Sequence, residues 1–350
     1  MSIALISVVI AAALILLFFL PLDYVRRARE IPIPSARMDE RDVMFSRTAR
    51  VSGTHEYDEY YSRHPELQRG DDRIRAMPPL MGTGAAKIHS ELSVEAERFF
   101  EDIYAIEPDG DVVEAWHDKI GEADDRDRAV REMIRSLGAV AVGATALRPE
   151  YLYSHKGRFP EDYGHAISLD HPSALLFLVE MDFVAMQCAP AVEVMRESAY
   201  QYYRAAVISK TVVAVLEALG YRAKSHHDAH YDCILPPLAV EAGLGEVGRH
   251  NILIADRYGT RVRIGAVTTD LPLSHDRPID LGVAHFCLHC QKCAANCPSR
   301  SLEAGEQQVV RGVLKWPTEA ERCYAYWRQM SSDCGICMAV CPFSHRSRLP

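Results

Sequence analysis

The sequence predicts an α/β (α+β) protein of two domains, preceded by an N-terminal transmembrane helix. Three observations predict this: an apolar run at residues 3–22, alternating helix-like and strand-like patterns between about 126 and 275, and eight of ten cysteines crowded between 287 and 341. Alternating helices and strands are typical of mixed folds, and 350 residues are enough for two cores. We expect segments at 1–24, 25–80, 81–275 and 276–350.

The apolar run predicts a membrane anchor, with residues 1–24 as the transmembrane segment. Only Ser7 and Pro21 interrupt it, and twenty helical residues span roughly 30 Å, the thickness of a bilayer's hydrocarbon core. A cleaved signal peptide is the alternative, but no basic stretch precedes the run and no A-x-A-like site follows. Three arginines lie within residues 26–29. The positive-inside rule therefore predicts a single-pass protein of the cell inner membrane with its body on the cytoplasmic face.

The segments after the anchor differ in pattern. Residues 25–80 are rich in proline, charge and tyrosine without a sustained period, which predicts a linker or wrapping arm. In the core, helical spacing over 127–137 and 205–219 ends at a glycine each time. Strands are expected at 139–142, 174–179 and 261–268. The formal charge of −9 offers no basic excess for phosphates, so we expect no nucleic-acid partner.

The cysteine spacings predict two 4Fe-4S clusters of the bacterial ferredoxin kind. The first motif is Cys287-x2-Cys290-x2-Cys293-x3-Cys297-Pro298, and the second is Cys334-x2-Cys337-x3-Cys341-Pro342 with Cys323 upstream. In the bacterial run the cysteine before proline ligates the other cluster. One cluster would then use Cys287, Cys290, Cys293 and Cys341, and the other Cys297, Cys323, Cys334 and Cys337. Zinc is the alternative, but zinc ribbons use paired C-x2-C motifs.

A glycine-rich stretch, Gly243-x-Gly245-x-x-Gly248, matches the dinucleotide fingerprint. That fingerprint must follow a strand and open a helix. The prolines at 236 and 237 argue against a central strand before it. We therefore expect the three glycines to form tight turns beside a different large cofactor.

Several stretches resemble reductive dehalogenases. They are residues 243–250, 258–263, 268–273 and 286–298, together with 39–45, 64–67 and 219–223. The resemblance runs in order from about residue 39 to 343. It implies a nitroreductase-like core at 81–275 that holds a base-off corrinoid, and a two-cluster ferredoxin-like domain at 276–350 that delivers electrons to it. The cobalt would remove halogen from an organohalide.

The resemblance also implies site residues. The family's proton-donating tyrosine falls on Tyr203, with Tyr202 as the close rival, and its basic partner falls on Arg263, with Arg261 two residues away. His230 stands where the family places a polar residue of the substrate pocket, although a structural histidine is equally compatible with the sequence. A tyrosine is protonated at neutral pH, and a nearby guanidinium would stabilise its phenolate.

The expected partners are an organohalide and an external electron donor such as ferredoxin, flavodoxin or a membrane reductase, besides the membrane itself. Two alternatives stay open. One is a tRNA-modifying enzyme like epoxyqueuosine reductase, which has a related core and the same cofactors. The other is a non-catalytic iron–sulfur subunit that only passes electrons, because motifs alone do not establish a working site.

Overall fold

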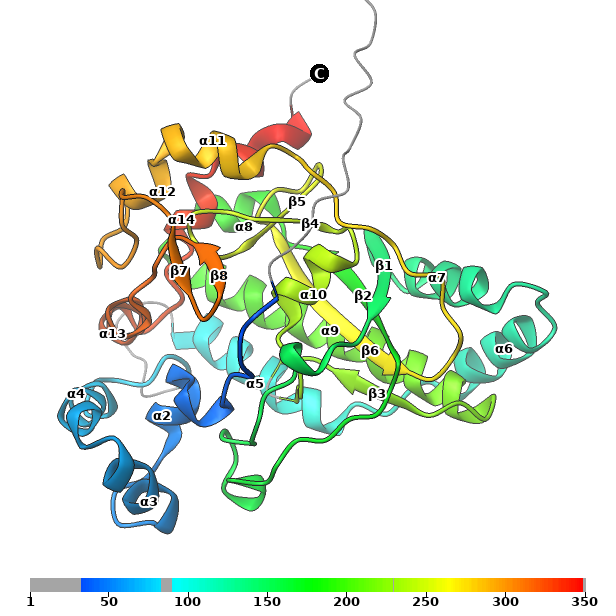
Figure 1. Cartoon of the computed structure of the whole chain (residues 1–350), viewed down its shortest axis with the longest axis horizontal. Helices are drawn as coiled ribbons and strands as arrows, with labels where there is room; N and C mark the ends of the chain where they lie inside the picture. The colour runs from blue at the N-terminus through cyan, green and yellow to red at the C-terminus, as the bar shows by residue number, and fades with distance from the viewer. Residues whose placement is uncertain (1–32, 83–89, 229, 349–350) are drawn as a thin grey trace, which may run out of the picture.

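A computed structural model describes residues 33–82, 90–228 and 230–348. Its centre is an antiparallel four-stranded sheet with the strand order β1-β2-β6-β3 (Figure 1). The strands are β1 (Ala141–Ala146), β2 (Ser173–Glu180), β6 (Val262–Thr269) and β3 (Ala223–His226). The two central strands, β2 and β6, pair along their whole length. β2 is buried on both faces, as its unbroken apolar sequence predicted.

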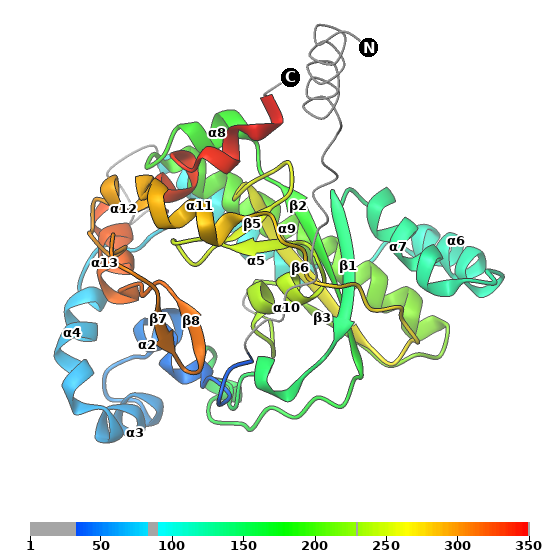
Figure 2. The same cartoon turned by 45° about the horizontal axis from the view of Figure 1, so that its top comes forward.

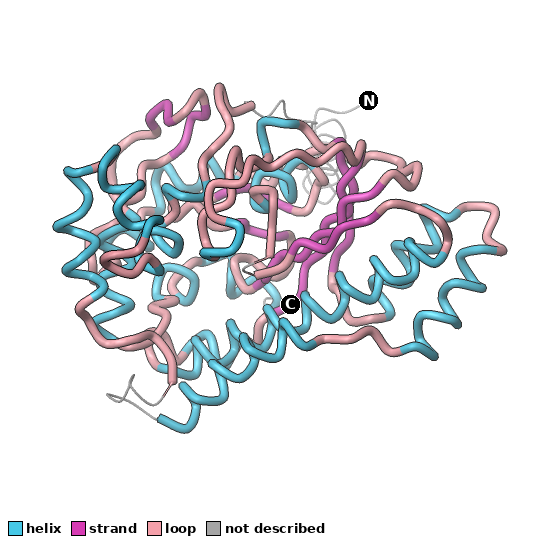
Figure 3. Tube along the Cα trace, turned by 90° about the horizontal axis from the view of Figure 1, so that it is seen from below, coloured by secondary structure: helices cyan, strands magenta, loops and turns pink. Residues whose placement is uncertain are grey.

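One face of the sheet is covered by helices (Figure 3). The helices are α9 (Val192–Ala218), α6 (Gly110–Gly121) and α7 (Arg126–Ser136), and α5 (Ser90–Ala105) packs on α9. Alternate β2 residues, Leu175, Phe177 and Val179, point into this core. The long helix α9 packs one side on the sheet, and residues of its N-terminal half also line a cavity.

The other face carries α10 (Leu235–Glu241) and a small hairpin of β4 (Gly245–Val247) and β5 (Leu253–Ala255). Leu176 and Leu178 of β2 point to this side. Three short helices complete the connections: η3 (Pro149–Tyr151), η4 (Pro160–Asp162) and α8 (Phe183–Gln187). The hairpin contains part of the glycine-rich stretch and places it next to the C-terminal part of the chain.

The C-terminal part lies beside this hairpin and α8 (Figure 2). It consists of α11 (Val283–Cys290), α12 (Lys292–Ala295), β7 (Gln308–Val310), β8 (Val313–Lys315), α13 (Ala320–Met330), α14 (Ile336–Ala339) and η5 (Pro342–Arg348). These elements are short, and their apolar cluster includes Cys287, Trp316 and Cys341. A small core of this kind is typical of a unit stabilised by bound metal.

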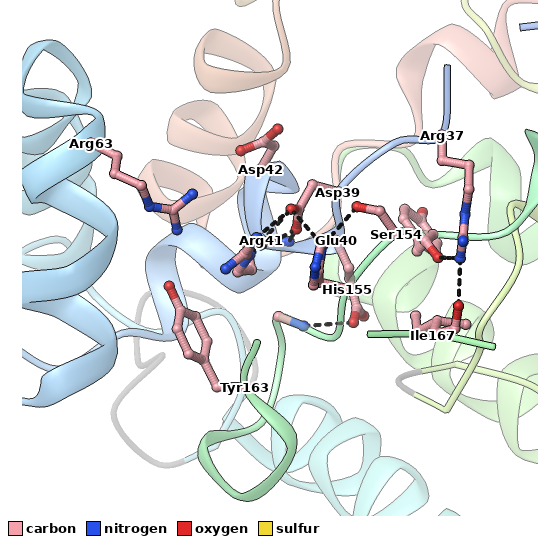
Figure 4. A network of polar contacts seen from close by, with 12 residues as sticks. Arg37, Asp39, Glu40, Arg41, Asp42, Arg63, Ser154, His155, Tyr163 and Ile167 are labelled. Carbon is pink, nitrogen blue, oxygen red and sulfur yellow. Dashed lines mark hydrogen bonds and ion pairs between the residues drawn. The ribbon is translucent and has the colours of Figure 1, made fainter. Parts of the chain in front are cut away.

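Residues 33–82 form helices where the sequence showed no periodic pattern. They are η1 (Glu40–Asp42), α2 (Met44–Ala49), α3 (His55–Arg63) and α4 (Pro65–Arg75). Polar contacts tie this arm to the core (Figure 4). Glu40 accepts a hydrogen bond from the Gly157 amide at 2.9 Å, and Arg37 donates to the carbonyl of Ile167 at 2.8 Å. The helices also pack on one another, because the tyrosines of α3 form a buried cluster with α4.

Arg47 is the central side chain of this arm. Its guanidinium binds both oxygens of buried Asp71 at 2.8 and 3.0 Å and reaches Glu321 of α13 at 2.6 Å. Arg47→Met should therefore destabilise the fold by about 3–5 kcal/mol, because it leaves the buried Asp71 carboxylate without its counter-charge and with the Tyr61 hydroxyl as a remaining hydrogen-bond donor. The measurement is the apparent unfolding midpoint in denaturant. Arg63→Met is the matched control and should cost about 1 kcal/mol or less, because exposed Arg63 forms a surface ion pair with Glu59. Equal losses in the two variants would contradict this prediction.

The mixed helix and strand architecture predicted from the sequence is confirmed. The strands expected at 174–179 and 261–268 correspond to β2 and β6, and the helix expected at 127–137 to α7. The strand expected at 139–142 begins two residues later, as β1. The helix expected at 205–219 is the second half of α9, whose first half begins at Val192. The boundaries of the predicted domains remain predictions.

The predicted localisation as a single-pass protein of the inner membrane is corrected by this structure. Within residues 33–82, 90–228 and 230–348, no helix combines the length and the apolar character needed to cross a bilayer. The segment on which the anchor was predicted, residues 3–22, lies outside the described residues.

Candidate active site

The eight cysteines of the two motifs gather into two groups. The first group consists of Cys287, Cys290, Cys293 and Cys341, which line one small cavity. The second group consists of Cys297, Cys323, Cys334 and Cys337, which line a much larger cavity of about 480 Å³. Each motif thus contributes one cysteine to the group of the other, as crossed ligation requires. Their role as iron ligands remains a prediction.

Burial makes bare thiolates unfavourable at several of these cysteines. Together with the neighbouring cysteines, it raises the pKa of Cys293, Cys341 and Cys323 to about 11. Cys297 differs, because its burial is outweighed by hydrogen bonds from Ser299 and nearby backbone amides, which lower its pKa. Crowded, buried thiols need a cationic centre if they are to ionise, and metal binding to them releases protons. Within the described residues, no three His, Cys, Asp or Glu side chains converge as they would around a single metal ion. The donor set and its chemistry fit a polynuclear iron–sulfur cluster in each group.

The large cavity lies between the second group and the sheet. Its walls are mostly apolar and aromatic side chains from the arm, α10, the β4–β5 hairpin and β6, with Phe45, Tyr153, Leu235, Ile252 and Ile264 among them. Polar side chains from several segments also line it, including Tyr202 of α9 and Arg263 of β6. A large cofactor with apolar faces could therefore lie beside a cluster and within reach of polar side chains.

Tyr202 and Arg263 are neighbouring polar side chains on the wall of the large cavity. Tyr202 projects from α9 and Arg263 from β6, and the guanidinium carbon lies 4.8 Å from the centre of the tyrosine ring. Burial raises the pKa of Tyr202, while the charge of Arg263 acts in the opposite direction. The phenol is therefore protonated at neutral pH, and the guanidinium is placed to stabilise the phenolate once the proton has left.

Arg263 is oriented from behind by a short polar chain. Its Nη2 donates to Ser198 Oγ at 2.6 Å, and Ser198 in turn hydrogen-bonds Asp333, the residue before Cys334. Burial raises the pKa of Asp333. The Nε of Arg263 is buried without a hydrogen-bond partner among the described residues. A buried, unpaired donor on a cavity wall is costly unless a bound group accepts from it.

A second charged pair borders the same cavity. Arg158 faces Asp228 at 3.9 Å, and Tyr231 and His227 lie beside them. Burial lowers the pKa of His227 to about 4, so its imidazole is neutral near pH 7. The wall thus offers a guanidinium, a carboxylate, a phenol and a neutral imidazole to whatever enters.

The other residues predicted from the family lie away from this cavity. Tyr203, the first choice for the proton donor, packs against Phe99 and borders a separate groove between α5 and α9. Arg261 is buried in an ion pair with Glu180 at 2.7 Å. His230 is exposed and its ring stacks on Phe159, with centroids 5.5 Å apart. Of the three predicted catalytic side chains, only Arg263 borders the cavity.

The three glycines predicted to bind the cofactor do not border the cavity either. The motif leaves helix α10 and enters strand β4, so the strand-then-helix context of a dinucleotide site is absent here. A Cβ on Gly243 would lie 2.6 Å from the carbonyl oxygen of Arg277, and one on Gly245 would lie 2.3 Å from that of Ile254. These glycines allow close backbone approach within the hairpin.

Sequence reasoning assigned no role to Ser198, Asp333, Arg158 or Asp228. Two of them carried a usable signal. Ser198 precedes Tyr202 by four residues on one helix, so the two share a face. Asp333 is adjacent to a motif cysteine. Arg158 and Asp228 lie in irregular segments whose spatial proximity no sequence pattern shows.

Sequence comparisons show which known proteins this chain is similar to. Residues 286–345 match the 4Fe-4S dicluster domain. The chain is 33% identical over 202 residues to a tetrachloroethene reductive dehalogenase of Desulfitobacterium hafniense, covering 53% of this chain and 36% of that protein. It is 29% identical over 249 residues to the enzyme of the same name from Sulfurospirillum multivorans, covering 61% and 49%. A shorter match, 29% over 112 residues and 31% of each protein, is to epoxyqueuosine reductase of Lactococcus garvieae.

Solved structures agree over most of the chain. A catabolic reductive dehalogenase superposes with a TM-score of 0.69 at 25% identity, covering 91% of this chain and 44% of that one. A complex of that dehalogenase with 3-bromo-4-hydroxybenzoic acid gives 0.65 at 27%, covering 93% and 45%. A reductive dehalogenase structure described as suggesting a mechanism for B12-dependent dehalogenation gives 0.63 at 27%, covering 91% and 44%.

The chain spans about a third to a half of the length of the relatives that it matches. The resemblance predicted from the sequence motifs is confirmed by both kinds of comparison. The chain is a relative of the reductive dehalogenases, which are oxidoreductases, and its residues 286–345 match the 4Fe-4S dicluster domain.

Proposed function

We propose that this protein is a corrinoid-dependent reductive dehalogenase whose two 4Fe-4S clusters deliver electrons to the large cavity. The observation that carries the proposal is the position of that cavity. The second cysteine group and the Tyr202–Arg263 pair both line this cavity. An electron source and a proton source thus border one mostly apolar space, which is what reductive replacement of a halogen by hydrogen requires.

The lining of the cavity supports the corrinoid that the resemblance implies. Its apolar walls suit the faces of a large ring, and the unpaired Nε of Arg263 offers a donor to a bound group. Bound there, a corrinoid would supply the cobalt chemistry for removal of the halogen. The protein's own contribution is to hold the substrate, keep water away and place one proton.

Tyr202 is the proton donor in this proposal, in place of Tyr203. Its phenol is protonated because burial raises its pKa, and its ring lies under the Arg263 guanidinium. Loss of the proton leaves a phenolate that the guanidinium stabilises directly. Ser198 and Asp333 act as positioning residues, because they hold Arg263 in this orientation.

Electrons would enter through the first cysteine group and leave through the second. Cys337 of the second group is close enough to Cys293 of the first for their charges to interact, so the two clusters would be neighbours. The second group alone borders the large cavity. An external protein donor would then reduce the first cluster, and the substrate would be an organohalide. In this proposal, residues 81–275 form the corrinoid-binding core and residues 276–350 form the cluster domain.

The test begins with metal content. Full-length protein, produced without oxygen and supplied with corrinoid, is expected to bind about one cobalt and about eight irons, because each cluster holds four. With a strong artificial reductant it should release halide from 3-bromo-4-hydroxybenzoic acid or tetrachloroethene. Eight irons without cobalt would overturn the catalytic proposal and leave an electron-transfer subunit. Cobalt and iron with no halide release, but reduction of epoxyqueuosine in tRNA, would favour the second enzyme family.

A further inference from the structure

The turn after the glycine-rich stretch joins the hairpin to the first cysteine group. Arg249, which is 1% exposed, donates to the carbonyl oxygen of Cys287 at 2.8 Å and to those of Glu303 and Gly305 at 2.9 and 2.8 Å. Its guanidinium carbon lies 4.7 Å from the centre of the Trp316 ring. The position of the next residue relative to this group is therefore fixed by several buried bonds.

That next residue, His250, lies between the two cysteine groups. It is 5% exposed and borders both the small cavity of the first group and the large cavity of the second. Gly248 makes room for its ring, because a Cβ there would lie 2.9 Å from Cε1 and 3.3 Å from Nε2 of His250. A side chain at the third glycine of the motif would therefore clash with the His250 ring.

The hydrogen bond that His250 accepts shows which ring nitrogen carries the proton. Nδ1 accepts the Ile252 amide at 3.1 Å, so it carries no proton and the proton of the neutral ring is on Nε2. Burial lowers the pKa of His250 to about 4, in agreement with a neutral ring. Nε2 is buried and has no hydrogen-bond partner among the described residues. Such a donor costs roughly 1–3 kcal/mol unless something accepts from it.

We propose that His250 Nε2–H donates a hydrogen bond to a sulfur of the cluster held by the first cysteine group, and that this bond raises the reduction potential of that cluster. The inference rests on the cluster assignment in the proposed function. The first group is favoured over the second because Arg249 fixes the turn to the backbone of Cys287. A reduced cluster carries one more negative charge than an oxidised one, so a donor to its sulfur stabilises the reduced form more.

Two substitutions separate the donor from the rest of the ring. His250→Gln places an amide N–H near the position of Nε2, whereas His250→Asn retains an acceptor near Nδ1 but no donor that reaches as far. The measurement is an EPR-monitored redox titration of the full-length protein. Cys290→Ala and Cys334→Ala proteins, each lacking one cluster, assign the two signals. We expect the first cluster of His250→Asn to have a more negative midpoint potential, with His250→Gln close to the wild type.

An unchanged first-cluster potential in His250→Asn at full iron content, or a shift confined to the second cluster, would overturn the inference. A measurement on the unsubstituted protein avoids dependence on variant folding. With ¹⁵N-labelled histidine, pulsed EPR of the reduced first cluster should show coupling to ¹⁵N and to an exchangeable proton, and the absence of both couplings would also overturn it. A chain that binds no iron would overturn the cluster assignment itself, so the two failures are distinguishable.

Discussion

Replacing Cys341 with alanine is expected to halve the iron content, from about eight to about four atoms per chain, by removing the first cluster. Cys341 belongs to the second motif in sequence, but it lines the small cavity with Cys287 and Cys290. Alanine offers no ligand to iron, so a cluster that depends on this thiolate should not assemble. The measurement is iron and sulfide content together with the EPR spectrum after reduction.

The comparison of three variants makes this prediction specific. If ligation is crossed, Cys341→Ala should retain the same EPR signal as Cys290→Ala, and Cys334→Ala should retain the other one. A Cys341→Ala spectrum that matches Cys334→Ala would contradict the crossing and return Cys341 to the cluster of its own motif. Circular dichroism of each variant controls for global unfolding, because these clusters contribute to folding.

Tyr202→Phe is expected to lower the rate of halide release by roughly 10²–10⁴-fold, the usual contribution of a general acid. The phenol under Arg263 is the proton source in the proposed reaction, and phenylalanine retains the ring while removing the proton. Cobalt and iron contents should not change. The measurement is kcat for halide release at a saturating concentration of a brominated phenol.

The neighbouring tyrosine supplies the matched control. Tyr203→Phe removes one hydroxyl from the same helix, but that side chain packs on Phe99 outside the cavity. We expect its kcat to stay near the wild-type value. Loss of activity in Tyr203→Phe, with Tyr202→Phe unaffected, would reverse the assignment and restore the choice made from sequence. Equal losses in both would indicate a structural role for this part of α9.

The comparison of the two tyrosines shows where sequence reasoning stops. Successive residues on a helix point about 100° apart, so only one of the two can face a given cavity. Which one does so depends on how α9 rotates as it packs on the sheet through residues such as Val212 and Val215. The resemblance left two candidate residues, and packing places Tyr202, and not Tyr203, on the wall of the large cavity.

The glycine-rich stretch illustrates the same limit. Its prolines correctly argued against a dinucleotide site, because they begin helix α10. The sequence could not show that the glycines would form a hairpin against the C-terminal part of the chain. That arrangement depends on buried long-range bonds from Arg249, whose partners lie 38 to 56 residues away.

By itself the sequence determined the local and compositional features of this protein. The spacing of the cysteines before proline predicts iron–sulfur ligation from a short stretch of sequence. The unbroken or alternating apolar runs likewise predict strands β2 and β6. Only the tertiary structure decided that Tyr202, and not Tyr203, faces Arg263, and that residues 33–82 fold into helices. These outcomes depend on contacts between distant segments, whose free energy comes from burial and pairing that no local pattern encodes.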